Sequence, residues 1–298
     1  MPPRISIVTP SFNQGRFIEA TIQSVLAQGI EDLEYVVYDN CSQDRTLEIL
    51  KKYTPQLRWV SEPDQGQAQA VNKGIGSTQG EIIGWLNSDD VYYPNALKIV
   101  LDYIDTHPEV DVIYGEADHI DPAGQSIELY YTEPWNLERL KDVCYLSQPA
   151  VFFRRRVVEK FGLLDERLKY CMDYEYWLRL GLGGARFDHL PEKLAGSRLY
   201  PETKTLGSKI KVHAEINAML RRRLGRAPDR WLFNYAHAVL ELHGPTPSKR
   251  VGFAAAVCLH SLWAALRWNH SVSAAMLRTC WRWLGGAVLQ AYREMAGR

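Results

Sequence analysis

The first 114 residues of this 298-residue chain predict an α/β fold, with a parallel sheet and helices on both of its faces. Two observations indicate it: short apolar runs alternate with stretches of helical periodicity, and each apolar run stops abruptly at a polar cluster. The last hundred residues show long helical patterns instead. We therefore expect a helical region after the sheet.

Four strands are expected in the first ninety residues, at 5–10, 33–38, 57–60 and 81–86. Helical spacing is seen between them at 17–26, 46–53 and 67–73, the last of which we expect to end at Gly74. The carboxyl ends of parallel strands share one edge of a sheet. The polar clusters at 9–13, 39–44, 62–66 and 87–90 are therefore expected to converge on one rim.

A helix at 95–105 and a strand at 110–114 continue this alternation, and from residue 116 the rhythm changes. The pattern there predicts strands at 127–131 and 150–153, and helices at 137–143, 154–161 and 173–182. It then predicts four long helices, at 203–224, 230–242, 249–267 and 271–296, with a linker at 244–247.

The formal net charge is zero, but the charge is unevenly distributed. Residues 1–200 hold 20 Lys and Arg against 30 Asp and Glu, whereas residues 201–298 hold 15 against 5. An acidic front argues against nucleic acid as a partner. The basic, Trp-rich tail has two interpretations: contact with an anionic membrane face, or an ordinary helical cap whose Trp residues form a core.

The five cysteines are scattered and form no CxxC, which indicates neither a disulfide framework nor a zinc site. We expect a cytoplasmic protein without a signal peptide, because the chain runs from Met1 straight into a strand. The longest uncharged run of the tail, 251–266, is short for a membrane span.

The run from Glu81 to Asp90 is an apolar strand that ends in Asn87, Ser88 and two adjacent carboxylates. Neighbouring carboxylates repel each other, and a divalent cation removes that conflict. Asp89 and Asp90 are therefore candidate ligands for Mg²⁺ or Mn²⁺ held against phosphate. The alternative is a solvated loop in which Asp90 caps a helix that starts near Pro94.

Six segments in order resemble the signature of family-2 glycosyltransferases. They are residues 9–13, 39–46, 62–66, 72–74, 86–90 and 173–179. The resemblance implies a GT-A fold: a Rossmann-like, nucleotide-binding mixed sheet flanked by helices. It divides the chain into a transferase domain at 1–205, with a nucleotide-sugar half at about 1–115 and an acceptor half at 116–205, and a basic helical region at 206–298.

The resemblance also implies roles for individual residues. The donor-binding set is Thr9, Pro10, Ser11, Asn13, Asp39, Glu62, Asp64, Gln65, Lys73, Asn87, Ser88 and Asp89. Asp39 would accept a hydrogen bond from a base N–H, an interpretation that we favour over the structural alternative of an Asx turn at the strand end. Asn87 replaces the first acid of the family's D-x-D, which leaves Asp89 and Asp90 as metal ligands.

Asp173 corresponds to the family's general base, which takes a proton from the acceptor hydroxyl. Two further departures accompany it: Met172 replaces the preceding acid, and Tyr200 stands where many relatives carry a metal-binding histidine. Glu175 and Trp177 are expected in the acceptor region. Arg198 and Lys204 are alternative contacts for the pyrophosphate.

The resemblance therefore implies an inverting hexosyltransferase. It would move a sugar from a UDP- or dTDP-sugar to a hydroxyl of a glycan or lipid-linked acceptor in envelope polysaccharide synthesis, in the cytoplasm or at the inner face of the cell membrane. A non-catalytic glycan-binding relative is one alternative. A sugar nucleotidyltransferase is less favoured, because residues 9–16 contain one Gly and one Arg instead of a glycine-rich basic loop.

Overall fold

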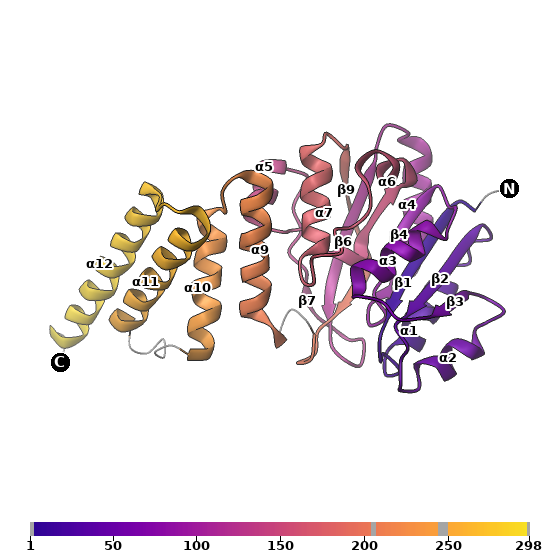
Figure 1. Ribbon diagram of the computed structural model, residues 1–298, viewed down its shortest axis with the longest axis horizontal. Coiled ribbons are helices and arrows are strands. Elements are labelled where there is room, and N and C mark those ends of the chain that lie inside the picture. Colours follow the sequence, from indigo (N-terminus) through magenta and orange to yellow (C-terminus); the bar gives the residue numbers. More distant parts are fainter. Residues whose placement is uncertain (1–2, 204–206, 244–249, 297–298) are drawn as a thin grey trace. The chain divides into compact units, whose positions relative to one another are not determined.

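The computed structural model describes residues 3–203, 207–243 and 250–296. The chain divides into two compact units, Met1–Pro201 and Glu202–Arg298 (Figure 1). The first unit contains a mixed sheet, and the second unit is helical.

The described residues of the first unit form one nine-stranded sheet, in the order β3-β2-β1-β4-β8-β6-β9-β5, with β7 beside β6. Its first four strands, β1 (Ile5–Ser11), β2 (Leu33–Asp39), β3 (Arg58–Ser61) and β4 (Ile82–Trp85), run parallel. The parallel sheet predicted for the first ninety residues is confirmed, and their polar clusters do share one edge.

The sheet becomes mixed after β4. Strand β8 (Val151–Arg154) pairs antiparallel with both β4 and β6 (Val112–Ile120). Strand β9 (Phe187–Arg198) runs parallel to β6, while β5 (Val91–Tyr92) and β7 (Ser126–Leu129) pair antiparallel with β9 and β6.

The sequence pattern does not predict β9 or β5. The centre of β9 is Pro191-Glu192-Lys193, where Glu192 and Lys193 are exposed, so the strand lacks the apolar alternation that identifies a strand. Strand β5 has two residues and exists only through its pairing with β9.

Helices cover both faces of the sheet. The helices of this unit are α1 (Ile18–Leu26), α2 (Thr46–Lys52), α3 (Gln67–Gly76), α4 (Ala96–Thr106), α5 (Leu137–Asp142), α6 (Arg155–Phe161) and α7 (Met172–Leu182), with a short 3₁₀ turn η1 (Gln148–Ala150). Ile5 and Ile7 of β1 belong to one core with apolar residues of α1, α2 and α4. Val8 faces the other way, as alternation along a strand requires, and lies against α3.

The contact between α3 and Val8 corrects one expectation. Helix α3 does not end at Gly74 but continues to Gly76. A Cβ on Gly74 would lie 2.2 Å from Cγ1 of Val8. This glycine therefore allows the helix to approach the sheet closely, and it does not terminate the helix.

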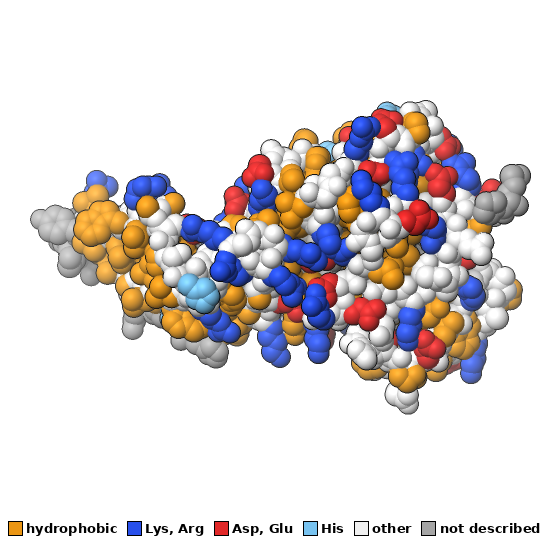
Figure 2. Space-filling view, turned by 45° about the horizontal axis from the view of Figure 1, so that its top comes forward, with side chains coloured by type: hydrophobic (Ala, Val, Ile, Leu, Met, Phe, Trp, Pro, Cys, Tyr) orange, Lys and Arg blue, Asp and Glu red, His pale blue; other side chains and the backbone are white. Residues whose placement is uncertain are grey.

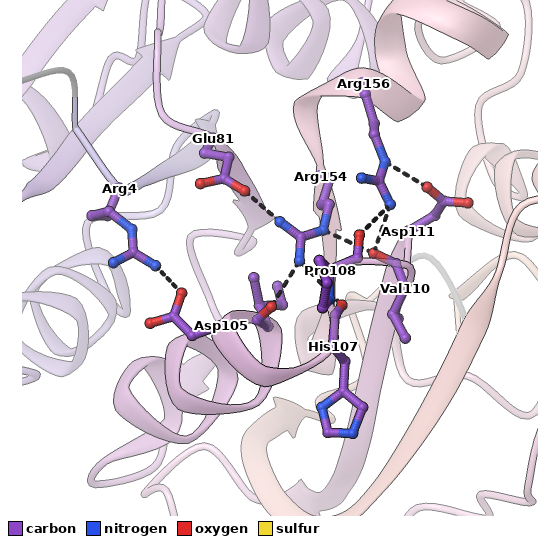
Figure 3. A network of polar contacts seen from close by, with 10 residues as sticks. Arg4, Glu81, Asp105, His107, Pro108, Val110, Asp111, Arg154 and Arg156 are labelled. Carbon is purple, nitrogen blue, oxygen red and sulfur yellow. Dashed lines mark hydrogen bonds and ion pairs between the residues drawn. The ribbon is translucent and has the colours of Figure 1, made fainter.

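Arg154, at the end of β8, stabilises the end of α4 (Figure 3). Its guanidinium donates to the carbonyl oxygens of Ile104 and Val110 at 2.8 Å each and to that of His107 at 3.2 Å, and it pairs with Glu81. The last carbonyl groups of a helix have no partners within the helix. The buried Arg154 side chain therefore satisfies two carbonyl groups at the end of α4, those of Ile104 and His107.

The second unit contains α9 (Lys209–Leu224), α10 (Asp229–His243), α11 (Arg250–Asn269) and α12 (Ala274–Ala296). The four predicted helices are confirmed, although the first begins later than expected. The predicted linker at 244–247 lies outside the described residues. Within the described part of the chain one segment, Val251–Asn269, is long and apolar enough to cross a membrane by length and composition.

Candidate active site

The carboxyl ends of three parallel strands place a row of polar side chains at one edge of the sheet. Ser11 of β1 is in register with Asp39 of β2, which is in register with Ser61 of β3. Oγ of Ser61 donates to Oδ2 of Asp39 at 2.7 Å. Thr9 and Pro10 precede Ser11 in the same buried strand end. Four of the residues expected to bind the donor therefore come from two adjacent strands.

Asp39 is buried, and hydrogen bonds hold its carboxylate. The amide of Ser42, three residues on, donates to Oδ2 at 2.9 Å, and the Ser42 hydroxyl donates to Oδ1. Asp39 therefore stabilises the strand end, but not through the expected Asx turn, which closes two residues on. This structural role is compatible with binding, because each carboxylate oxygen can accept more than one hydrogen bond.

The loops after β1 and β2 are joined through Asn13, which has a left-handed backbone with φ of 52°. Its amide donates to Oγ of Ser42 at 2.7 Å, and its Oδ1 accepts from the amide of Gln43 at 2.8 Å. Asp44 accepts from the amides of Gly15 at 2.8 Å and Thr46 at 3.0 Å. Burial opposes the shift, but these donors and the Thr46 hydroxyl lower the pKa of Asp44.

The loop after β3 is held at both ends. The amide of Asp64 donates to Oδ1 of Asn40 at 3.0 Å, and Oδ1 of Asp64 accepts from the amide of Gly66 at 2.8 Å. Nζ of Lys73 lies 2.7 Å from Oε1 of Glu62, and this hydrogen bond raises the pKa of Lys73. The amide of Gln65 donates to Oε1 of Gln69 at 2.9 Å, which ties this loop to the first turn of α3.

Asn87, at the end of β4, is the centre of an amide network. Its Oδ1 accepts from Nε2 of Gln67 at 2.6 Å and from Nε1 of Trp85 at 2.9 Å. Its Nδ2 donates to Oε1 of Gln148 at 2.8 Å and to Oδ2 of Asp90 at 3.1 Å. Every donor and lone pair of this amide has a partner inside the fold.

The two carboxylates after Asn87 differ in their surroundings. Asp90 is 4% exposed, and its Oδ1 accepts from the amide of Arg198 at 2.8 Å. Burial and the neighbouring charge of Asp89 raise the pKa of Asp90 well above its ordinary value. Asp89 is half-buried, and its Oδ2 accepts from the hydroxyl of Tyr200 at 2.7 Å. Ser88, between Asn87 and Asp89, is buried.

Arg198 is buried and holds this loop from the end of β9. Its Nε donates to the carbonyl oxygen of Asp89 at 2.7 Å, and its Nη1 donates to that of Asp121 at 2.8 Å. Because its guanidinium donates to backbone carbonyl groups, Arg198 stabilises the conformation of the loop and is not positioned as the expected pyrophosphate contact. Lys204, the other expected pyrophosphate contact, lies outside the described residues.

The carboxylates after Asn87 suit a divalent cation whose other ligands come from a substrate. Among the described residues no group of three or more His, Cys, Asp or Glu is gathered as a metal site. Both oxygens of Asp90 accept hydrogen bonds within the fold, and Asp89 is the more exposed of these two adjacent carboxylates. Mg²⁺ is commonly bound by one or two carboxylates together with substrate phosphates, so the residues fit such an ion.

Asp173 lies in the first turn of α7 and is half-buried. Its charge adds to burial in raising the pKa of both Cys144 and Tyr130. Cys144 precedes Gln148, which binds Asn87. The segment before α7 is tied to α3, because Nδ2 of Asn72 donates to the carbonyl oxygen of Leu164 at 3.0 Å. The segment that leads into α7 and Asp173 is therefore tied to α3, which follows the β3 loop.

The two residues expected in the acceptor region are fully buried. Glu175 forms an ion pair with Arg179, with 3.0 Å between Oε1 and Nε. Trp177 is 1% exposed and packs edge to face on Phe153. Both therefore support the wall of α7 from inside, and an acceptor would contact other side chains.

The sequence does not identify Gln148, Gln67 or Ser42 as site residues. Each makes a hydrogen bond that joins two loops of the rim or links the rim to η1. Ser42 lies within the motif at 39–46, but Gln148 is followed only by Pro-Ala and belongs to no motif. A single buried glutamine carries no sequence signal that distinguishes it from a surface residue.

The fold and this rim define a class of protein: a parallel half joined to a mixed half, with acidic loops at the shared edge, is the GT-A fold of glycosyltransferases. The family model described as "Glycosyl transferase family 2" matches residues 6–162, just over half of the chain. The chain belongs to glycosyl transferase family 2. The resemblance seen in the sequence is confirmed.

Relatives with names are similar to it over the same region. An uncharacterised glycosyltransferase of Rickettsia typhi is 31% identical over 220 residues, which cover 68% of this chain and 66% of the relative. The hyaluronan synthase of Pasteurella multocida is 29% identical over 231 residues, 74% of this chain and 23% of the synthase. The chain thus spans about two thirds of the former protein and less than a quarter of the latter.

Solved structures share the fold. The Staphylococcus aureus TarS fragment 1–349 in complex with UDP-GlcNAc has a TM-score of 0.62 at 18% identity, covering 98% of this chain and 92% of that one. The mannosyltransferase PcManGT of Pyrobaculum calidifontis, in complex with GDP-Man and Mn²⁺, has a TM-score of 0.60 at 17% identity, covering 99% and 83%.

Proposed function

We propose that this chain transfers a sugar, with inversion, from a nucleoside-diphosphate donor to a hydroxyl of a glycan or lipid-linked acceptor in envelope polysaccharide synthesis. The observation that carries the proposal is the belt of hydrogen bonds joining the four strand-end loops, which brings Asp39, Asp64 and Asp89 to one edge of a GT-A sheet. Family membership supports it, as do relatives named as polysaccharide synthases.

The donor would lie along this edge. Asp39 at the β2 end suits a base N–H, and UDP- or dTDP-sugars are the donors that such a contact favours. Asn13, Gln65, Lys73 and the loop from Asn87 to Asp89 would surround the phosphates and sugar. Asp89 would hold Mg²⁺ or Mn²⁺ together with diphosphate oxygens, and the chemistry supplied there is neutralisation of charge on the departing nucleoside diphosphate.

Asp173 would act as the general base. A half-buried carboxylate at the start of a helix can accept the proton of an acceptor hydroxyl as its oxygen attacks the anomeric carbon. Met172, which precedes it where the family has an acid, is uncharged and buried. We propose that the reaction takes place at the cytoplasmic face of a membrane.

The test is Asp173→Asn, assayed for transfer and for nucleotide binding. We expect transfer to fall by at least about a hundredfold, the scale of lost general-base catalysis, while binding of the nucleoside diphosphate is unchanged. A thermal-shift series of nucleoside diphosphates with Mn²⁺ identifies the donor base, because a ligand stabilises the folded state that binds it. Retained turnover in the variant would remove Asp173 from this role.

A second candidate is a non-catalytic relative that binds a sugar nucleotide or glycan. The observation that favours it is Asn87, whose amide is wholly committed to structure where the family has an acid. Donor hydrolysis, measured with and without EDTA, separates the two. An enzyme releases nucleoside diphosphate and stops when the cation is removed, whereas a binding protein releases none in either condition.

A further inference from the structure

Helix α12 of the second unit has an exposed apolar side. At 100° per residue, Leu277, Trp281 and Val288 lie within about 40° of one another around the helix axis. All three are exposed, and Trp281 is 81% exposed. Met276 and Cys280, about 120° and 80° around the helix axis from the middle of that side, are buried. A tryptophan so exposed adds little to the core, so folding of the unit does not explain it.

Helix α11 repeats the arrangement. Leu259, Trp263 and Leu266 follow one another at spacings of four and three residues and are exposed, while Cys258 and Ala265 beside them are buried. Figure 2 shows hydrophobic side chains over the second unit, interspersed with Lys and Arg. We call the six exposed residues of the two helices the α11–α12 surface.

Arginines flank this surface. Arg278 and Arg282 each follow an apolar member by one residue, so they lie about 100° further around α12. Both are exposed, as is Arg267 of α11. None of the three forms an ion pair with a described residue. The unit as a whole holds 15 basic against 5 acidic residues.

We propose that the α11–α12 surface docks on an anionic lipid surface, with Trp281 and its apolar neighbours at the headgroup boundary and the arginines on lipid phosphates. Apolar side chains with tryptophan beside a basic stripe have the composition that binds such an interface. A second protein copy would bring like charge against like. The inference goes beyond the proposed transfer reaction by naming the surface and the lipid charge that would place the enzyme beside a lipid-linked acceptor.

A spanning α11 fits the observations less well. Its length and apolar character are sufficient, but a third of that window is buried within the unit and it includes Arg267. The proposal therefore has the helices lying along the membrane plane.

The test is co-sedimentation of the full chain with vesicles, without donor or acceptor. We expect binding to phosphatidylcholine vesicles containing about 30% phosphatidylglycerol, weakening with salt, and little binding to phosphatidylcholine alone. Trp281→Gln and the double change Arg278→Gln with Arg282→Gln should each reduce partitioning by at least about fivefold. The matched controls, Leu129→Gln and Lys51→Gln, alter exposed residues of the first unit and should leave it unchanged.

Four results would overturn the proposal. They are no binding to anionic vesicles, equal binding to neutral ones, variants that bind as the parent does, and protein that resists alkaline carbonate extraction from membranes, which indicates a spanning helix. Self-association that Trp281→Gln abolishes, without vesicle binding, would assign the surface to a second copy instead. Donor hydrolysis is measured separately, so a failure of membrane binding leaves the proposed reaction standing.

Discussion

The phenolic hydroxyl of Tyr200 donates a hydrogen bond to Oδ2 of Asp89, with 2.7 Å between the two oxygens. Burial and the charge of Asp89 raise the pKa of Tyr200, so the hydroxyl keeps its proton and remains a donor. Its ring packs on Phe17, with 4.9 Å between centroids. Tyr200 therefore orients the carboxylate that we propose as the metal ligand, and we do not expect Tyr200 to bind the metal directly.

Tyr200→Phe tests this role. Loss of a partner that orients a ligand typically weakens metal binding by about tenfold to a hundredfold. We expect the Mn²⁺ concentration needed for stabilisation by a nucleoside diphosphate to rise accordingly in a thermal-shift titration. Tyr103→Phe is the matched control, because Tyr103 donates to Asp188 at 2.6 Å in a comparable pair outside the rim. An unchanged Mn²⁺ midpoint in Tyr200→Phe would contradict the role.

Asn87→Asp restores the acid that the family pattern contains, and we expect it to destabilise the fold. The Asn87 amide group donates to oxygens of Gln148 and Asp90, and the change replaces it with a carboxylate that cannot donate to either and repels that of Asp90. We expect the free energy of unfolding to fall by about 2–4 kcal/mol. Urea denaturation measures it. Asn136→Asp, at the N-cap of α5 where the side chain accepts from Arg139, should stay within about 0.5 kcal/mol. Equal stability of the two variants would show that the amide network is dispensable.

Gly74→Ala should destabilise the first unit by about 1–3 kcal/mol, because the new methyl group has no room beside Val8. Gly76→Ala, two residues later in the same helix, has nothing within 4 Å and should be neutral or stabilising by up to about 1 kcal/mol. Chemical denaturation of both variants gives the comparison. If Gly74→Ala were as stable as Gly76→Ala, the close approach of α3 to β1 would be wrong.

His213 should make the second unit sensitive to acid. Burial, followed by the charge of Lys209, lowers the pKa of His213 below its ordinary value of 6.5. In acid the folded state then holds fewer protons than the unfolded state. The contribution of neutral His213 to the free energy of unfolding is therefore fully present above pH 6.5 and is lost as the pH falls from there through the folded-state pKa.

The measurement is the Tm between pH 8 and pH 5, with His213→Phe expected to reduce its acid dependence. His270→Asn, at an exposed position with φ of 55°, should leave that dependence unchanged, because asparagine tolerates this conformation. A Tm that falls identically in all three proteins would assign the acid sensitivity to other groups.

The amino-acid sequence by itself determined the family, the four parallel strands and the edge at which their polar turns meet. These features follow from local patterns: apolar runs of strand length, helical spacing between them, and the right-handed crossover that brings strand ends together. The motifs around Asp39, Asp89 and Asp173 identified the candidate site for the same reason, since each lies in a short contiguous stretch.

Only the tertiary structure decided how those motifs are held. It joined Asn87 to Gln148, placed Tyr200 on Asp89, buried Trp177 and Glu175, and made Gly74 a point of close approach. It also formed β9, whose exposed centre has no strand pattern of its own. These features depend on pairs of residues far apart in the chain. The strength of a hydrogen bond or a packing contact depends on the distance between their atoms, and that distance cannot be read from the local spacing of residues in the sequence.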